Sequence, residues 1–143
     1  HPVKELVWVV QLDDAVAAGD AYQPNNFTTQ VDALGENNVA SALIQLNGHE
    51  RFSERDGTYF NVVQPYQHHT RSPAVGINVY SFCEKPEEHQ PTGSANFSRI
   101  DNANLVLTLA NVGGTLTRTV RVYAVNYNVL RIMSGMGGLA FAN

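Results

Sequence analysis

The chain has 143 residues, enough for one domain with a substantial hydrophobic core. Hydrophobic residues make up 43% of it and charged residues only 15%, against about a quarter in a typical protein, which predicts a polar rather than an ionic surface. The net charge is −4 and the nine Lys and Arg residues are scattered. Composition therefore excludes a broad electrostatic attraction to nucleic acid, and we predict no direct nucleic-acid binding.

The chain has one cysteine, Cys83, and no apolar run that approaches the roughly 20 residues needed to span a bilayer. A lone cysteine allows no intrachain disulfide, which fits assembly in a reducing compartment. The sequence opens at His1-Pro2, with neither an initiator methionine nor a signal-peptide pattern. We therefore expect this sequence to be part of a longer polypeptide.

The first third of the chain contains two strand-like runs separated by a long polar stretch. Leu6 to Leu12 is short, apolar and rich in Val, which predicts a strand buried on both faces, with Trp8 in the core or at a subunit contact. Asp13 to Asn38 is polar and predicts a long functional loop, with one helical turn at Asp13 to Ala18. Val39 to Gly48 alternates, which predicts a strand whose core face is formed by Ala40, Ala42, Ile44 and Leu46.

The middle of the chain is more irregular. Gly48 to Gly57 is a charged connection that ends in the turn signal Asp56-Gly57. Tyr59 to Val63 fits either a short aromatic strand or a turn of helix, whereas two prolines in Gln64 to Pro73 predict irregular structure.

A further strand and a polar block follow. Ile77 to Phe82 predicts the strand, which leads into Pro86 to Asp101, a proline-framed connection of the kind found at the rim of a sandwich. The end of this block, around Asn96 to Asp101, predicts a short strand.

The last third of the chain predicts several strands. Ala103 to Asn111 alternates with its leucines on one face, and Asn111 to Thr115 is a hairpin signal because Gly-Gly accepts positive φ angles. Leu116 to Asn126 alternates with Val120, Val122 and Ala124 facing inward. Tyr127 to Met133 is expected to continue this strand after a bulge, and Leu139 to Phe141 to form a short edge strand. About seven strands joined by loops of unequal length predict an antiparallel jelly roll.

Two sequence positions match the glycosylation sequon. Asn26-Phe27-Thr28 makes Asn26 a candidate glycosylation site, with a chance match as the alternative. Asn96 begins the second sequon but lies on a predicted strand, where its backbone is expected to be paired, and it ranks below Asn26.

Side chains suited to catalysis or metal binding form no familiar pattern. His49 precedes a glutamate, and His68 and His69 are adjacent, so each pair diverges on an extended chain and we predict no metal site. One charged loop holds four more titratable groups, which we expect to be solvated: Glu84, Glu87, Glu88 and His89. Cys83 ends a predicted strand, which indicates a buried, inert thiol. We predict no catalytic residue and no cofactor.

Long blocks of this sequence resemble the major capsid protein of nucleocytoplasmic large DNA viruses, the group of iridoviruses, phycodnaviruses and mimivirus-like viruses. They are PEEHQPTGSANFSRID, at Pro86 to Asp101, and VRVYAVNYNVLRIMSGMGGLAF, at Val120 to Phe141. The resemblance covers nearly the whole chain and is also dense at Tyr59-Phe60, Pro65-Tyr66 and His68-His69. Several long blocks in one order are far more specific than a short motif.

The resemblance implies two tandem jelly rolls per subunit, three subunits in a near-hexagonal capsomer, and an icosahedral shell over an internal membrane. Residues 1–143 are then expected to form the C-terminal jelly-roll domain, without the first jelly roll and without the opening strand of the second. A sandwich that lacks one strand has an unpaired edge and an open core. We therefore expect it to be stable only within the shell, or once further sequence completes it.

The sequence as a whole predicts an all-β protein, an antiparallel jelly-roll β-sandwich that forms the second half of a double jelly-roll capsid protein. It is expected to be a structural virion protein, assembled in the host cytoplasm. Expected partners are copies of itself in a homotrimer, neighbouring capsomers, minor capsid proteins and an inner membrane. Two alternatives remain open: a carbohydrate-binding sandwich that stacks sugars on Trp8 or loop tyrosines, and a metal-dependent jelly-roll enzyme that uses His68 and His69.

Overall fold

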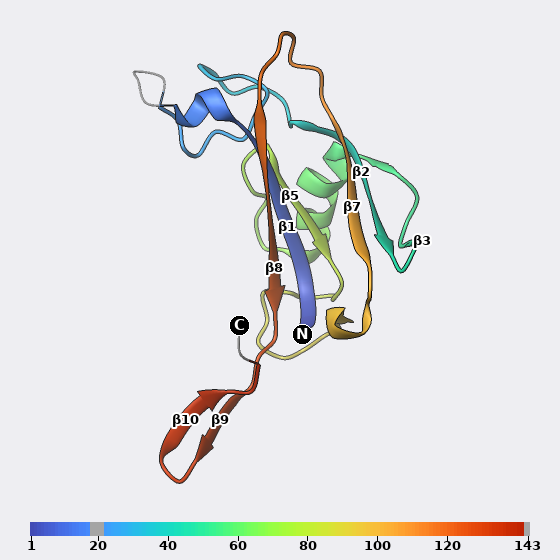
Figure 1. Ribbon diagram of the computed structural model, residues 1–143, viewed down its shortest axis with the longest axis vertical. Coiled ribbons are helices and arrows are strands. Elements are labelled where there is room, and N and C mark those ends of the chain that lie inside the picture. Colours follow the sequence, from blue (N-terminus) through green and yellow to red (C-terminus); the bar gives the residue numbers. More distant parts are fainter. Residues whose placement is uncertain (18–21, 142–143) are drawn as a thin grey trace.

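The computed structural model describes residues 1–17 and 22–141, which form two antiparallel β-sheets facing each other across a hydrophobic core (Figure 1). The central strand of the first sheet is β1 (Pro2–Leu12). Along one of its edges lie β5 (Ile77–Ser81) and β6 (Ala95–Asn96), and along the other lies β8 (Arg118–Asn126). The prediction of an all-β antiparallel sandwich is confirmed.

The second sheet is built on β2 (Val39–Leu46). The long strand β7 (Ala103–Leu109) pairs with one of its edges, and the other edge holds the short strands β3 (His49–Glu50) and β4 (Arg55–Asp56). The two short strands lie inside the stretch predicted to be a plain charged connection. A separate hairpin of β9 (Leu130–Met133) and β10 (Met136–Leu139) projects from the body (Figure 1).

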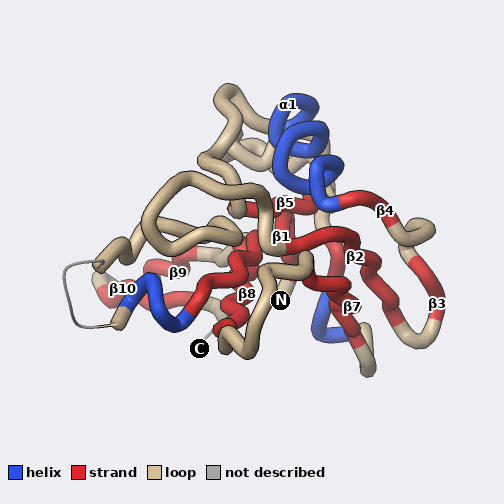
Figure 2. Tube along the Cα trace, turned by 90° about the horizontal axis from the view of Figure 1, so that it is seen from above, coloured by secondary structure: helices blue, strands red, loops and turns tan. Residues whose placement is uncertain are grey.

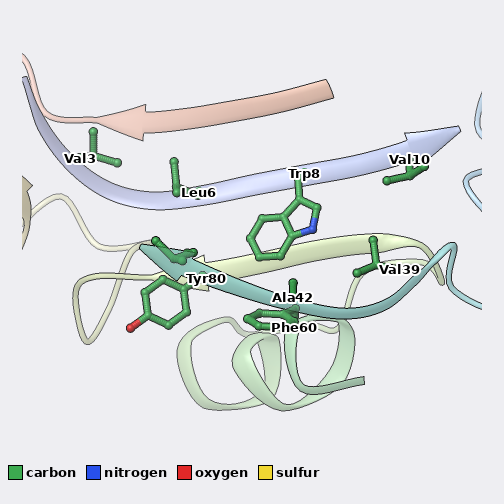
Figure 3. Packing of buried hydrophobic residues seen from close by; sticks show 9 residues of the cluster. Val3, Leu6, Trp8, Val10, Val39, Ala42, Phe60 and Tyr80 are labelled. Carbon is green, nitrogen blue, oxygen red and sulfur yellow. The ribbon is translucent and has the colours of Figure 1, made fainter. Parts of the chain in front are cut away.

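Alternation along β1 places its large side chains in the core. Leu6, Trp8 and Val10 point toward β2 and toward Phe60 (Figure 3), and the indole of Trp8 is completely buried. The ring centroids of Trp8 and Phe60 lie 5.1 Å apart. The opposite face of β1 is covered by loops, so Gln11 is buried as well. The predicted burial of this strand on both faces is confirmed, with Trp8 in the core.

A helical segment closes one side of the sandwich. It consists of the π-helix η2 (Tyr59–Val63), which continues into the α-helix α1 (Gln64–His68). Figure 2 shows these helices beside β5 and β4, away from β7 and β8. The helical alternative for the first stretch is confirmed. The prediction of irregular structure for Gln64 to Pro73 holds for residues 69–73 and is wrong for Gln64–His68, because η2 runs directly into α1 and Pro65 follows the π-helical turn without breaking the helix.

The polar block before β7 and the turn after it both differ from the prediction. Only Ala95–Asn96 is extended, and Phe97–Arg99 forms a 3-10 helix, η3, in which the Ser98 amide donates a hydrogen bond to the Asn96 side chain. Gly113 and Gly114 do adopt positive φ angles. The predicted hairpin is nevertheless absent, because β7 pairs with β2 while β8 pairs with β1, so this turn crosses between the sheets (Figure 1).

Buried side-chain amides, among them those of Gln11 and Asn38, tie the long loop after β1 to the body. It begins with the 3-10 helix η1 (Asp13–Val16), which confirms the predicted helical turn up to the edge of the described residues. The Asn38 side chain, fully buried, donates hydrogen bonds to the carbonyls of Val10 at 2.9 Å, Phe27 at 3.0 Å and Thr28 at 2.8 Å. These bonds give the loop a defined path across the end of the first sheet.

Candidate assembly surface

Strand β8 is exposed along its length although its sequence alternates. Val120, Val122 and Ala124 pair with Val10, Trp8 and Leu6 and so lie on the core-side face, as predicted. Their predicted burial is wrong, because no strand of the second sheet lies over that face: Val122 is 51% exposed and Val120 is 44% exposed. This strand therefore presents an apolar face that the described residues leave uncovered.

An apolar slot lies between the sheets on this side. It has a volume of about 240 Å³ and is lined mainly by side chains from β1, β2, β7, η3 and β8: Leu6, Ile44, Leu46, Phe97, Leu105 and Val122. The leucines predicted to share one face of β7 differ in burial, since Leu105 and Leu107 are half-buried whereas Leu109 is 39% exposed. The core is thus closed by helices on one side and open on the other.

The same side carries two free strand edges. Within residues 1–17 and 22–141, β8 pairs only with β1 and β7 pairs only with β2. A long edge with unpaired N–H and C=O groups is a template for a further strand. Together, the two edges and the slot form what we call the open side of the sandwich, a surface suited to another β-strand.

The β9–β10 hairpin is a second exposed apolar feature. Its turn residues Ser134 and Gly135 both have positive φ angles, 51° and 76°, as a two-residue hairpin turn of this kind requires. Five of its large apolar side chains are more than half exposed: Leu130, Ile132, Met133, Met136 and Leu139. The predicted edge strand at Leu139 to Phe141 is wrong, because the strand ends at Leu139 and the glycines before it are extended rather than turn residues.

The charged loop after β5 is held at the rim by a histidine. The His69 ring lies between two carboxylates, with Nε2 at 2.7 Å from Glu5 Oε2 and Nδ1 at 3.1 Å from Glu87 Oε1. The hydrogen bond from His69, followed by one from the Thr70 amide, lowers the pKa of Glu87. No sequence pattern pointed to Glu5 as a member of this group, since it lies on a strand 64 residues away from His69.

The other members of the predicted charged cluster do not converge on a shared site. Lys85 and Glu88 form an ion pair at 3.5 Å, and the carbonyl of Glu84 accepts a hydrogen bond from His68 at 2.8 Å. Across the described ranges, no group of three or more His, Cys, Asp or Glu side chains is arranged to hold a metal ion. Cys83 is buried, as predicted.

Two candidate ligand or modification sites are enclosed. Trp8 is inaccessible to a sugar because no part of it reaches the surface. Asn26 is 6% exposed, and its Nδ2, the atom that a glycan would occupy, donates hydrogen bonds to Gln23 Oε1 at 2.9 Å and to the Gln30 carbonyl at 2.8 Å. Glycosylation of Asn26 stays a prediction, and the folded loop disfavours it. In the described residues, no helix is long and apolar enough to cross a membrane.

Solved structures with this fold are viral capsid proteins. VP54 of PBCV-1, determined by crystallography and fitted into a cryo-EM reconstruction of the virophage Sputnik, matches with a TM-score of 0.75 and 40% identity over 100% of this chain and 44% of that one. The Faustovirus major capsid protein, at 14% identity, matches with a TM-score of 0.67 over 87% of this chain and 30% of that one, a likeness of fold alone. The antiparallel sandwich is therefore a jelly roll of the capsid-protein type.

Sequence comparisons agree with the fold. The major capsid protein of Chrysochromulina ericina virus is 61% identical over 94% of this chain and 23% of its own length, and that of Phaeocystis pouchetii virus is 71% identical over 76% of this chain and 21% of its own length. The chain thus spans about a quarter of the length of these curated relatives. A profile of the family described as large eukaryotic DNA virus major capsid protein matches residues 1–138. The chain belongs to this family of capsid proteins.

Proposed function

We propose that this chain is the C-terminal jelly roll of a major capsid protein and that its work is subunit contact rather than catalysis. The observation that carries the proposal is the open side of the sandwich, where two unpaired strand edges flank an apolar slot. A soluble monomer that worked alone would gain nothing from such a surface, which favours aggregation unless it is covered.

The open side offers a further strand two free edges and an apolar slot. A strand added to β8 or β7 would pair its backbone groups with a free edge and place alternate side chains in the slot. We assign this strand to the part of the same polypeptide that precedes the jelly roll, since the matched relatives are about four times as long as this chain. Residues 1–143 would then lack only the opening strand of a complete sandwich.

The exposed β9–β10 hairpin and the rim loops are assigned to contacts between subunits. Three copies would form a pseudo-hexagonal capsomer, and capsomers would pack into an icosahedral shell in the virion, assembled in the host cytoplasm. A ring of this kind repeats one heterologous contact around a closed rotation. Minor capsid proteins and an inner membrane are the further expected partners, and the net charge of −4 gives no reason for direct contact with DNA.

Substitution of Val122 tests the proposal, because this side chain points into the slot and is half exposed in the chain. In the full-length polypeptide, Val122→Lys is expected to abolish trimers and larger lattices, since it places an unpaired charge where a strand should pack. Val122→Thr, which keeps the shape and the β-branch, is the matched control. Mass photometry and negative-stain electron microscopy measure the outcome, and lattices of normal yield from Val122→Lys would refute the proposal.

A further inference from the structure

The group of Glu5, His69 and Glu87 links three segments that are far apart in the sequence. Glu5 belongs to β1, His69 follows α1, and Glu87 lies in the charged loop at residues 84–92. The side chains of Glu5 and His69 are only 10% and 18% exposed, whereas that of Glu87 is 42% exposed. The contact between Glu5 and His69 is therefore largely buried, whereas Glu87 is accessible to water.

With both carboxylates ionised, the geometry calls for a doubly protonated ring. An ionised carboxylate only accepts hydrogen bonds, so both nitrogens of His69 must donate to hold the observed contacts. A neutral imidazole has one donor, which leaves a lone pair facing the other carboxylate. The proton that stays is expected to point at Glu5, because that contact is shorter and more buried.

We propose that Glu5, His69 and Glu87 form a proton-dependent clasp that fastens the 84–92 loop to the sheet and loosens its hold on Glu87 when the His69 ring loses a proton. Other charged groups nearby are engaged elsewhere: Lys4 donates to the Pro86 carbonyl at 2.9 Å, His68 binds the Glu84 carbonyl, and Lys85 pairs with Glu88. Among the residues described, the His69 ring is hydrogen-bonded to Glu5 and Glu87. Glu87 also accepts hydrogen bonds from the amide and the hydroxyl of Thr70 at 3.3 Å, so losing the His69 contact loosens the outer part of the loop, while Thr70, Lys4 and His68 still hold it near the sheet.

The clasp has a limited pH window. Histidine side chains commonly change charge between about pH 5 and pH 8, so a contact that needs a doubly protonated ring is weakened as pH rises across this range. The pKa of Glu87 is lowered in the folded protein, so its contribution is present above the unfolded pKa and is lost as pH falls through the folded pKa. The loop is held between these two limits and is loosened on either side of them.

Hydrogen–deuterium exchange tests the clasp. The measured quantity is the protection of the amides of residues 84–92, relative to those of β7 and corrected for intrinsic exchange rates. We expect it to fall roughly tenfold as pH rises from 5.5 to 8.5, because a charged hydrogen bond typically changes an opening equilibrium by that factor. His69→Gln should remove the step, and His49→Gln, an exposed histidine on β3, should retain it. A flat wild-type profile, or an unchanged step in His69→Gln, overturns the proposal.

A second variant keeps the proposal testable if His69→Gln does not fold. Glu87→Gln alters a partly exposed loop side chain, and it should leave the loop weakly protected at every pH while protection of β7 is unchanged. A pH step of normal size in this variant also overturns the proposal. The clasp does not rest on the proposed function, since local exchange reports on it whether or not the protein assembles.

Discussion

Phe60 is the side chain whose removal should test the core most directly. It is completely buried in η2, and its ring centroid lies 5.1 Å from that of Trp8, 5.1 Å from Tyr59 and 5.6 Å from Phe52. Truncating a buried Phe to Ala usually costs about 3–5 kcal/mol, and each aromatic pair lost adds about 0.5–1.5 kcal/mol beyond burial. We therefore expect Phe60→Ala to cost about 4–5 kcal/mol, a large share of a typical domain stability.

This cost corresponds to a fall in melting temperature of about 13–17 °C for a domain of this size, from the usual unfolding entropy per residue. Differential scanning calorimetry measures it, and the fluorescence of Trp8, which packs on Phe60, gives an independent signal. Tyr66→Ala is the matched control, because Tyr66 is an aromatic residue of the adjoining helix that is 82% exposed. If both variants melt within about 3 °C of the wild type, the assignment of the core is wrong.

Two further predictions concern single positions. Gly76 has a φ of +95°, and a Cβ there would lie 2.3 Å from the Phe27 carbonyl oxygen. Gly76→Ala should therefore lower the free energy of unfolding by at least about 2 kcal/mol. A urea midpoint equal to that of the wild type would contradict this prediction. Cys83 is 5% exposed, so its thiol should react with a maleimide on the order of 100-fold more slowly in the native protein than in urea, and equal rates would show that the strand end is open.

Alternation of side chains predicted most of the long strands, because it reports directly on which face a strand buries. It identified β2, β7 and β8, and the apolar run identified β1. The errors occur where the same residue type is compatible with two different backbone structures. The π-helical turn before Pro65 lets the helix continue where a proline was expected to prevent regular structure, and Gly137 and Gly138 adopt an extended backbone within β10.

Pairing between strands was less predictable than the strands themselves. Gly113 and Gly114 mark a tight turn in any fold, but they cannot show whether the strands on either side pair with each other or, as observed, belong to opposite sheets. The His69 clasp was missed for the same reason. Glu5 lies in an apolar strand, and only the packed structure brings it to a histidine 64 residues away.

Strand β8 bears both on what the sequence could predict and on the proposed function. Its alternation correctly predicts which face is turned toward Trp8, yet Val122 on that face is half exposed. An apolar side chain on the core-side face of an exposed strand fits our proposal that a partner packs there, and the apolar slot beside Val122 is the surface that we propose it covers.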